Sequence, residues 1–590
     1  MPPKRPLKRR GEEDDRRQSK KAGKNKREIT YDTYDEALDG GVEMEEKGER
    51  YRDGDKAQRF YERAVELYEK ALGFSQTYDA AYNQARTLYT LSTSFLLPPT
   101  SLASLRRSIE LYRLATTLTN SPLLRMDVAF NLSQSCSSLA DILEDLDVDN
   151  TQIDEVRKQR EEARDILQEV MDGQEEYLRA TSEEDDADET EEVVDEMEIA
   201  PVDSSQDEES MQVDEDKDED QDEKEGEGEG EGEGSFETHL PTRSTYIDTV
   251  LALIDIHLSL WTSTTEPKTP SEEEQMAVRQ ILDRTGVFAP PGRQAELDLC
   301  EVKVLLGMDS IVWEIYKNQA HPNMGLEKSL EGAIAALTAI LGSLDITPPE
   351  DLTVRPEILT ILSDTHMEIA NRMLVLNRQL PPGPSPLAQQ AWYHLSQATS
   401  HLTTALDLPT NALTPKAFKP SVLLNLSKAS LRRARLADIH ETAKRNVGQL
   451  MDNAFTYATR AGEGLGVKFV KIDGTSTTAG SGMSLSIGGT MGGGEELPWQ
   501  SGWENELLIR NIILHQLRNG LYATRTNLVP EEQDRQKYGS GLQKITKKLS
   551  GLKGERKLGA DDVKRFLAEI EDEEGLIEDL EKSWWNELFA

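Results

Sequence analysis

The sequence predicts an all-α protein, a helical-repeat solenoid interrupted by a disordered acidic insertion. Three observations predict it: apolar residues recur at helical spacing, small and aromatic residues return at fixed offsets, and charge is concentrated in two segments. A chain of 590 residues is long enough for about three to five domains or one long solenoid. Cys136 and Cys300 are its only cysteines, which excludes a disulfide framework or cysteine-based zinc module and indicates a reducing compartment.

Residues 1–41 are expected to form a basic disordered tail. From Lys4 to Arg27 the sequence holds twelve basic and four acidic residues, in short blocks typical of a bipartite nuclear-localisation signal read by an import receptor. A nucleic-acid-binding tail and an intramolecular partner for the acidic insertion are the alternatives. Nuclear import is favoured because no aromatic residue before Tyr31 could stack on bases. The candidate signal residues are Lys4, Arg5, Lys8, Arg9, Arg10, Lys20, Lys21, Lys24, Lys26 and Arg27.

Residues 42–180 are expected to form a first helical module. Between Phe60 and Leu72 the apolar residues follow the i, i+3, i+4, i+7 stripe of an amphipathic helix. Pro98-Pro99 predicts a turn, and Ser121-Pro122 predicts a helix start.

Internal repeats are a stronger signal than helicity alone. Two small residues seven positions apart flank a third residue, four positions after the first, which is aromatic, leucine or alanine. This pattern occurs at Ala64/Tyr68/Ala71, Ser108/Tyr112/Ala115, Ala398/Leu402/Ala405 and Ala454/Ala458/Ala461. The segment Phe130-Asn-Leu-Ser-Gln134 is also echoed by Leu424-Asn-Leu-Ser-Lys428.

These residues resemble the tetratricopeptide-repeat (TPR) superfamily, so the expected fold is TPR-like. Gly48-Glu-Arg-Tyr51 is similar to the first helix of such a repeat, and Tyr68-Glu-Lys-Ala-Leu72 to the second, although the interval from Ala64 to Ser108 is longer than the usual repeat. The resemblance implies a concave groove lined by the first helices, where polar side chains could hold a peptide. An inter-helix hydrogen bond is the alternative role for them. The groove candidates are Asn83, Gln84, Arg86, Asn131, Gln134, Asn425 and Lys428.

Residues 181–238 are expected to form the acidic disordered insertion. Within 183–233 there are 28 acidic and two basic residues, so this stretch carries −26 of the net charge of −42. So few large apolar side chains cannot offset the entropy of ordering the backbone. The insertion either solubilises the protein or docks a basic partner.

Residues 239–528 are expected to form a second TPR-like module containing a glycine-rich loop at 473–496, and residues 529–590 a charged helical tail. Trp499 and Trp503 are expected to anchor the module's last helix, from Trp503 to Leu521. The tail ends in an aromatic segment that is either an exposed binding motif or a cap packed on the solenoid. Its residues are Trp584, Trp585, Leu588 and Phe589.

No constellation of catalytic residues is found, so the protein is expected to be non-enzymatic, with no cofactor and no metal. The eight histidines are dispersed; His394 and His401 could share a helix face but have no third ligand in the sequence pattern. The glycine-rich stretches lack the Lys-Ser/Thr of a phosphate-binding loop, and neither cysteine has a basic neighbour. The longest apolar run, 250–261, is too short for a bilayer, so no membrane association is expected.

The sequence therefore favours a nuclear scaffold or adaptor, shuttling or resident, that binds proteins and escorts a basic client such as a histone or ribosomal protein. The layout also resembles the fungal enhancer of translation termination family: Lys4-Arg5-Pro6-Leu7, a basic tail, TPR-like helices and an acidic insertion. That resemblance implies a regulator of translation termination or a nuclear transport adaptor, although Lys8-Arg9-Arg10 departs from the family's pattern and no functional residue is transferred. An RNA-binding factor using the basic tails is a further, less favoured alternative.

Overall fold

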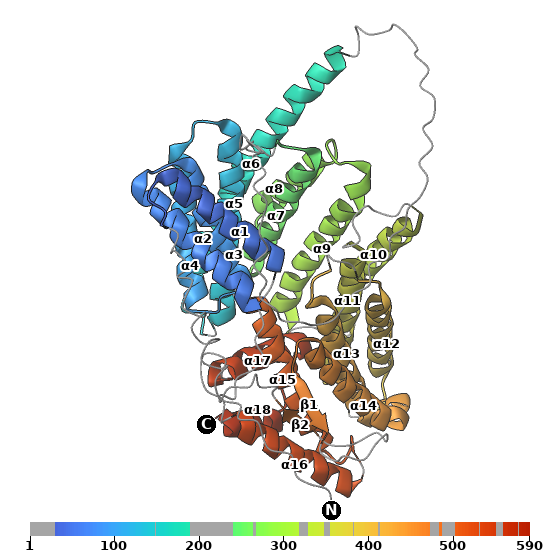
Figure 1. Cartoon of the computed structure of the whole chain (residues 1–590). Coiled ribbons are helices and arrows are strands. Elements are labelled where there is room, and N and C mark those ends of the chain that lie inside the picture. Colours follow the sequence, from blue (N-terminus) through green and yellow to red (C-terminus); the bar gives the residue numbers. More distant parts are fainter. Residues whose placement is uncertain are drawn as a thin grey trace, which may run out of the picture.

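In the computed structural model the chain is an array of α-helices, most of which pack against their neighbours in sequence (Figure 1). The predicted all-α solenoid is confirmed. The structure describes residues 30–52, 54–147, 149–188, 240–263, 267–317, 328–346, 354–381, 383–410, 414–471, 483–486, 502–529, 531–549, 558–575 and 577–589. Within these ranges no helix is long and apolar enough to cross a membrane.

Six helices precede the acidic insertion and form three pairs of sequence neighbours, each pair packed on the next. The residues of the predicted repeat pattern in the second helix of each of the first two pairs, Ala64/Tyr68/Ala71 and Ser108/Tyr112/Ala115, are completely buried. Small side chains at this spacing allow close helix packing, so each copy of the sequence pattern marks the buried face of one helix. The helices are α1 (Tyr34–Tyr51), α2 (Gly54–Phe74), α3 (Tyr78–Ser94), α4 (Thr100–Leu118), α5 (Pro122–Leu146) and α6 (Ile153–Asp188).

Two glycines explain how closely α1 approaches α2. A Cβ atom added at Gly41 would lie 2.4 Å from Cε1 of Tyr68, and one at Gly48 would lie 2.9 Å from Cε2 of Tyr61. Both tyrosines are buried, so their rings have little space to move. The glycines of the first helix therefore provide the space that the tyrosines of the second helix fill.

The helices after the insertion continue the same array. α7 packs on α6, and residues from α3 through α9 share one hydrophobic cluster, so the core does not divide at the acidic insertion. The apolar run 250–261 lies within α7, and Val250, Ile254 and Trp261 are buried there. The helices are α7 (Arg243–Thr262), α8 (Glu272–Thr285), α9 (Gln294–Tyr316), α10 (Lys328–Ile346), α11 (Val354–Asn377), α12 (Pro386–Asp407), α13 (Phe418–Arg435) and α14 (Glu441–Gly464), with short 3₁₀ helices at Pro291–Arg293 and Leu436–Asp438.

The C-terminal helices fold back onto the array. α15 packs on α14, and α17 contacts both α11 and α15; the helices from α15 to the C-terminus are orange-red to red in Figure 1. The side chain of Trp503, at the start of α15, donates a hydrogen bond from Nε1 to Oδ2 of Asp145 at the end of α5, over 2.8 Å. α15 is therefore tied to the first module as well as to the second. The elements are β1 (Lys468–Lys471), β2 (Met483–Ser486), α15 (Trp503–Ala523), α16 (Glu532–Leu549), α17 (Ala560–Glu574) and α18 (Asp579–Phe589).

Two helix boundaries and one element differ from the expected organisation. α1 begins at Tyr34, inside the expected tail, because Thr33 and Glu36 form a capping box: Oγ1 of Thr33 accepts from the Glu36 amide, and Oε2 of Glu36 accepts from the Thr33 amide. α6 continues to Asp188, beyond the expected start of the insertion at 181. β1 and β2 form a two-stranded antiparallel pair that the helical pattern did not predict, with Lys468 opposite Ser486. Most of the glycine-rich loop 473–496 lies outside the described residues.

Candidate protein-binding surfaces

Two of the α3 candidates make contacts between helices of the first module. Gln84 is buried, and its Nε2 donates to the carbonyl of Val65, 3.4 Å away on α2. Arg86 pairs with Glu45 of α1 over 2.9 Å, and Oε2 of Glu45 also accepts from the Tyr68 hydroxyl over 2.8 Å. Both side chains thus take the alternative role that the sequence left open, joining neighbouring helices.

Asn131 of α5 is placed differently, at the wall of a cavity. Its Nδ2 donates to the Tyr82 hydroxyl over 3.2 Å, to the carbonyl of Asp127 over 2.9 Å and to Oδ1 of Asp127 over 3.2 Å. This carboxamide therefore fixes a tyrosine of α3 and an aspartate of α5 beside each other. The prediction singled out Asn131 but missed Tyr82 and Asp127, although Asp127 stands one helical turn before Asn131 and could have been found from that spacing.

The cavity has a volume of about 320 Å³ and lies where α3, α5, α6 and α7 meet. Its size is at the lower end of the range typical of ligand pockets. The wall is mixed, with about as many polar as aromatic or apolar residues. The lining residues include Tyr82, Met126, Asp127, Phe130, Asn131 and Gln174.

The cavity is negatively charged. Burial raises the pKa of Tyr82, and the nearby Asp127 carboxylate raises it further; the same two causes raise the pKa of Tyr78, whose ring stacks on Tyr82 at 5.5 Å. Asp248 also lines the cavity but pairs with Arg293 over 2.7 Å. Among the residues that the structure describes, Asp127 has no ion pair; its contacts are with neutral groups. The uncompensated charge in this cavity therefore belongs to Asp127.

In the echoed segment of the second module, the last residue is covered by the chain itself. Lys428 of α13, which corresponds to Gln134 in the echoed segment, is 9% exposed, and its Nζ lies 2.8 Å from Glu569 and 2.8 Å from Glu573 of α17. Asn425, which corresponds to Asn131, is half-buried on the same helix. The C-terminal segment thus occupies the face of α13 that the sequence predicted as a groove wall.

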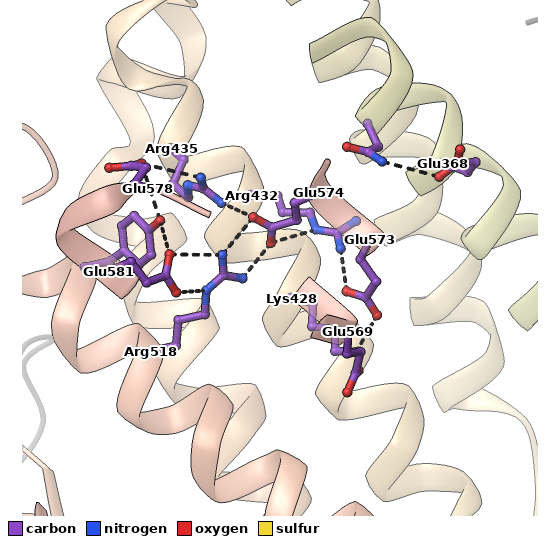
Figure 2. A network of polar contacts seen from close by, with 12 residues as sticks. Glu368, Lys428, Arg432, Arg435, Arg518, Glu569, Glu573, Glu574, Glu578 and Glu581 are labelled. Atoms are coloured by element: carbon purple, nitrogen blue, oxygen red, sulfur yellow. Dashed lines mark hydrogen bonds and ion pairs between the residues drawn. The ribbon is translucent and has the colours of Figure 1, made fainter. Parts of the chain in front are cut away.

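Figure 2 shows how this contact extends into a network of buried ions. Arg518 of α15 is 2% exposed and binds Glu574 of α17 over 2.6 Å and Glu581 of α18 over 2.7 Å. Arg432 of α13 bridges Glu573 over 2.6 Å and Glu574 over 3.3 Å, and Arg435 also pairs with Glu574. Cations of α13 and α15 therefore hold carboxylates of α17 and α18.

The network remains ionised at neutral pH. Burial alone would raise the pKa of Glu574, but Arg518 and Arg435 lower it well below the usual value. Burial would lower the pKa of Lys428, whereas Glu573 and Glu569 raise it above the usual value. A second cavity of about 300 Å³ borders the network, with Arg378 and Arg525 among its lining residues. Charges on these walls are already shared among protein groups, so this region fixes the C-terminal helices in place.

The aromatic tail packs against that region. Trp585 is completely buried, and its ring makes edge contacts with Phe566 at 5.2 Å and with Trp584 at 4.7 Å. Trp584 and Leu588 are partly buried against the same hydrophobic cluster. Of the two roles that the sequence left open, this is the cap. The side chain of Phe589 lies outside those described.

The remaining candidates are less defined. Asn83 and Gln134 are half-buried on α3 and α5. Every candidate residue of the nuclear-localisation signal, from Lys4 to Arg27, lies outside the described residues.

Three of the described histidines lie close together, and both cysteines are buried. His366 of α11 lies beside both His394 and His401 of α12: its Nδ1 lies 2.9 Å from Nδ1 of His394, and its ring stacks on His401 at 5.4 Å. Within the described ranges no group of three or more histidine, cysteine or acidic residues is arranged to hold a metal ion. Burial raises the pKa of both Cys136 and Cys300 to about 12, so both thiols stay protonated at neutral pH.

No protein-family model and no curated protein matches the sequence. Solved structures similar to the chain include three of Nro1 from S. pombe, described as a nuclear import adaptor and, in one case, also as the hypoxic regulator of sterol synthesis. Their identities are 11%, 12% and 13% and their TM-scores 0.26, 0.30 and 0.30; the matches cover 66%, 65% and 67% of this chain and 99%, 92% and 98% of theirs. Similarity at this level does not establish a shared function.

Proposed function

We propose that this chain is a non-enzymatic nuclear scaffold or adaptor that binds a basic protein, such as a histone or a ribosomal protein. The partner would lie on the inner face of the first helical module, by which we mean the face on which Asp127 and Asn131 of α5 lie. The observation that carries the proposal is the difference between the two echoed segments. On α5, Asn131 lines a cavity beside the Asp127 carboxylate, which has no ion pair among the described residues, whereas on α13 Lys428 is covered by α17. The first module therefore offers the accessible surface, and its charge suits a basic partner.

The acidic insertion strengthens this preference. Residues 183–233 carry −26, and a field of that size attracts a basic surface and speeds its association. In this proposal the insertion supplies the long-range attraction, while the inner face of α3 and α5 supplies the contact. The two contributions differ in how salt affects them, because contacts between exposed charges are screened and contacts in a partly buried cavity are screened less.

Binding of a purified core histone complex to the full-length chain tests the proposal, with an acidic protein of similar size as the control. The histones should bind and the control should not. Deleting residues 183–234 should weaken the binding and make what remains less sensitive to salt. Equal binding of the histones and the acidic control would contradict the proposal. So would a deletion variant that binds histones as well as the full-length chain does, at both low and high salt.

A nuclear transport adaptor, or a regulator of translation termination, is a second candidate because of the twelve basic residues between Lys4 and Arg27. In either case an import receptor would bind that tail. A fluorescent fusion of the full-length chain should accumulate in nuclei, and the same fusion lacking residues 4–27 should not. Nuclear accumulation of the deletion would reject the role assigned to the tail.

A further inference from the structure

We propose that the cavity between α3, α5, α6 and α7 is a receptor for one lysine or arginine side chain of an extended partner peptide, with the Asp127 carboxylate as its counter-ion. This inference rests on the proposed function and adds the binding site and the chemical group that it recognises. The partner supplies the cation in trans.

The first argument is charge. Asp127 is half-buried, and its described neighbours are neutral: the Asn131 amide donates to its Oδ1 and also to the Tyr82 hydroxyl. Within the described residues no cation of the chain compensates it. An ammonium or guanidinium entering the cavity would form a charge-assisted hydrogen bond there, which is stronger than one between neutral groups.

A second and independent argument comes from Gln174 of α6. This residue lines the cavity, it is only 7% exposed, and its Oε1 accepts no hydrogen bond within the described part of the chain. A buried acceptor without a donor is unfavourable. Lysine and arginine side chains carry three and five N–H donors, so one that binds the Asp127 carboxylate has further donors for a neighbouring acceptor such as Gln174.

The remaining wall suits the aliphatic stem of the same side chain. Met126 and Phe130 line the cavity, and the Tyr82 ring adds an aromatic face, which attracts a cation electrostatically. Asn131 links Tyr82 to Asp127 through its two hydrogen bonds, so the aromatic face and the carboxylate keep a fixed relation. An acidic or neutral side chain would gain neither contact, which makes the site selective for cations.

Photo-crosslinking tests the inference with the full-length chain. The probe is a glycine- and serine-flanked peptide that carries one lysine beside a diazirine amino acid, and the control peptide has norleucine in place of that lysine. Mass spectrometry should locate crosslinks from the lysine peptide on α5, α6 and α7 around the cavity. Asp127→Asn should lower their yield about tenfold, which corresponds to the loss of one charge-assisted contact. Gln174→Leu, a second variant that keeps an apolar volume, should also lower it.

Two internal comparisons make the outcome specific. Asp165→Asn removes the same charge from α6 at a side chain that is 68% exposed and paired with Arg164, so it should leave the yield unchanged. Crosslinks to residues 189–239 provide an internal standard, because neither variant in the cavity changes the charge of that segment. Cavity crosslinks that persist in Asp127→Asn and Gln174→Leu, or that form equally with norleucine, would overturn the inference.

The same experiment separates this inference from the proposed function. Crosslinks on other parts of the inner face of α1, α3 and α5 would overturn the cavity as the site and still support partner binding by the first module. Crosslinks confined to residues 189–239 would overturn both. Displacement of the probe by a peptide of residues 1–29 added at low concentration would overturn the partner in trans, since the chain's own tail would then be the occupant.

Discussion

Replacing Arg518 by Met should selectively release the C-terminal helices. Arg518 is 2% exposed, and among the described residues its guanidinium is the one that forms an ion pair with Glu581, which is completely buried. Methionine keeps the apolar stem and removes the charge. Glu581 would then retain only the Tyr522 hydroxyl, 2.8 Å away, while Glu574 would still have Arg432 and Arg435. Removing one partner of a buried ion pair typically costs about 3–5 kcal/mol, because the other charge is left buried and unpaired.

Amide hydrogen exchange is the appropriate measurement, since it reports on the opening of α17 and α18 separately from the rest of the array. A loss of about 3–5 kcal/mol corresponds to exchange that is at least about a hundredfold faster across residues 558–589. Arg107→Met is the matched control. Arg107 pairs with Glu110 on the exposed surface of α4, where the two side chains are 52% and 62% exposed, so the loss should be about 0.5 kcal/mol or less.

A double variant tests the reason for the effect. In Arg518→Met/Glu581→Leu the stranded carboxylate is replaced by an apolar side chain, and apolar replacements of whole buried ion pairs are often neutral or stabilising. This variant should therefore exchange more slowly over 558–589 than Arg518→Met alone. Equal effects of Arg518→Met and Arg107→Met, or no recovery in the double variant, would refute the assignment of Arg518 as the charge that holds α18.

Two further predictions concern the scaffold. Gly41→Ala should destabilise the first module by about 1–3 kcal/mol, because its Cβ would lie 2.4 Å from the buried Tyr68 ring; chemical denaturation monitored by amide exchange in α1 and α2 measures this. The control is Gly448→Ala on α14, which has no atom within 4 Å of its added Cβ and should stabilise the protein by up to about 1 kcal/mol. Changes in stability of the same sign in both variants would contradict the packing argument. Burial, then His394 and His401, lowers the pKa of His366 from 6.5 to about 4. The unfolded chain therefore binds protons first as pH falls from 6.5 to 4, so the thermal midpoint should fall over this window, and less steeply in His366→Leu; an equally steep fall in the variant would argue against the imidazole cluster.

The sequence predicts the packing of the helix pairs well, because that packing depends on local spacing. The recurring small and aromatic residues, such as Ala64 and Tyr68 or Ala454 and Ala458, are completely buried where the structure places them. Helix starts with a strong local signal were also predictable: Ser121 caps α5 with Pro122 in its first turn. The start of α1 at Tyr34 has the same kind of local signal, the capping box of Thr33 and Glu36, but the expected boundary was at residue 42.

The ion network could not be predicted in the same way, because its partners are far apart in sequence. Lys428 and Glu569 are separated by 141 residues, and Arg518 and Glu581 by 63. A charged helix face has the same pattern whether it meets solvent or an opposing face, and the sequence holds many acidic faces that Arg518 could have met. The cavity beside Asn131 has the same difficulty, since it needs α3, α5, α6 and α7 together and α7 follows the acidic insertion.

The two Asn-Leu-Ser segments show what decides the fate of a groove residue. Asn131 and Asn425 lie in nearly the same local sequence on α5 and α13, so propensity and spacing treat them alike. What differs is the next layer: α17 brings Glu569 and Glu573 to Lys428 on α13, whereas the face of α5 borders a cavity in which Asp127 has no ion pair among the described residues. Acidic side chains of α17 thus cover the basic residue of the second segment within the chain. By the same electrostatic logic Asp127, one helical turn before Asn131, is complementary to a basic segment, and a partner in trans would supply it.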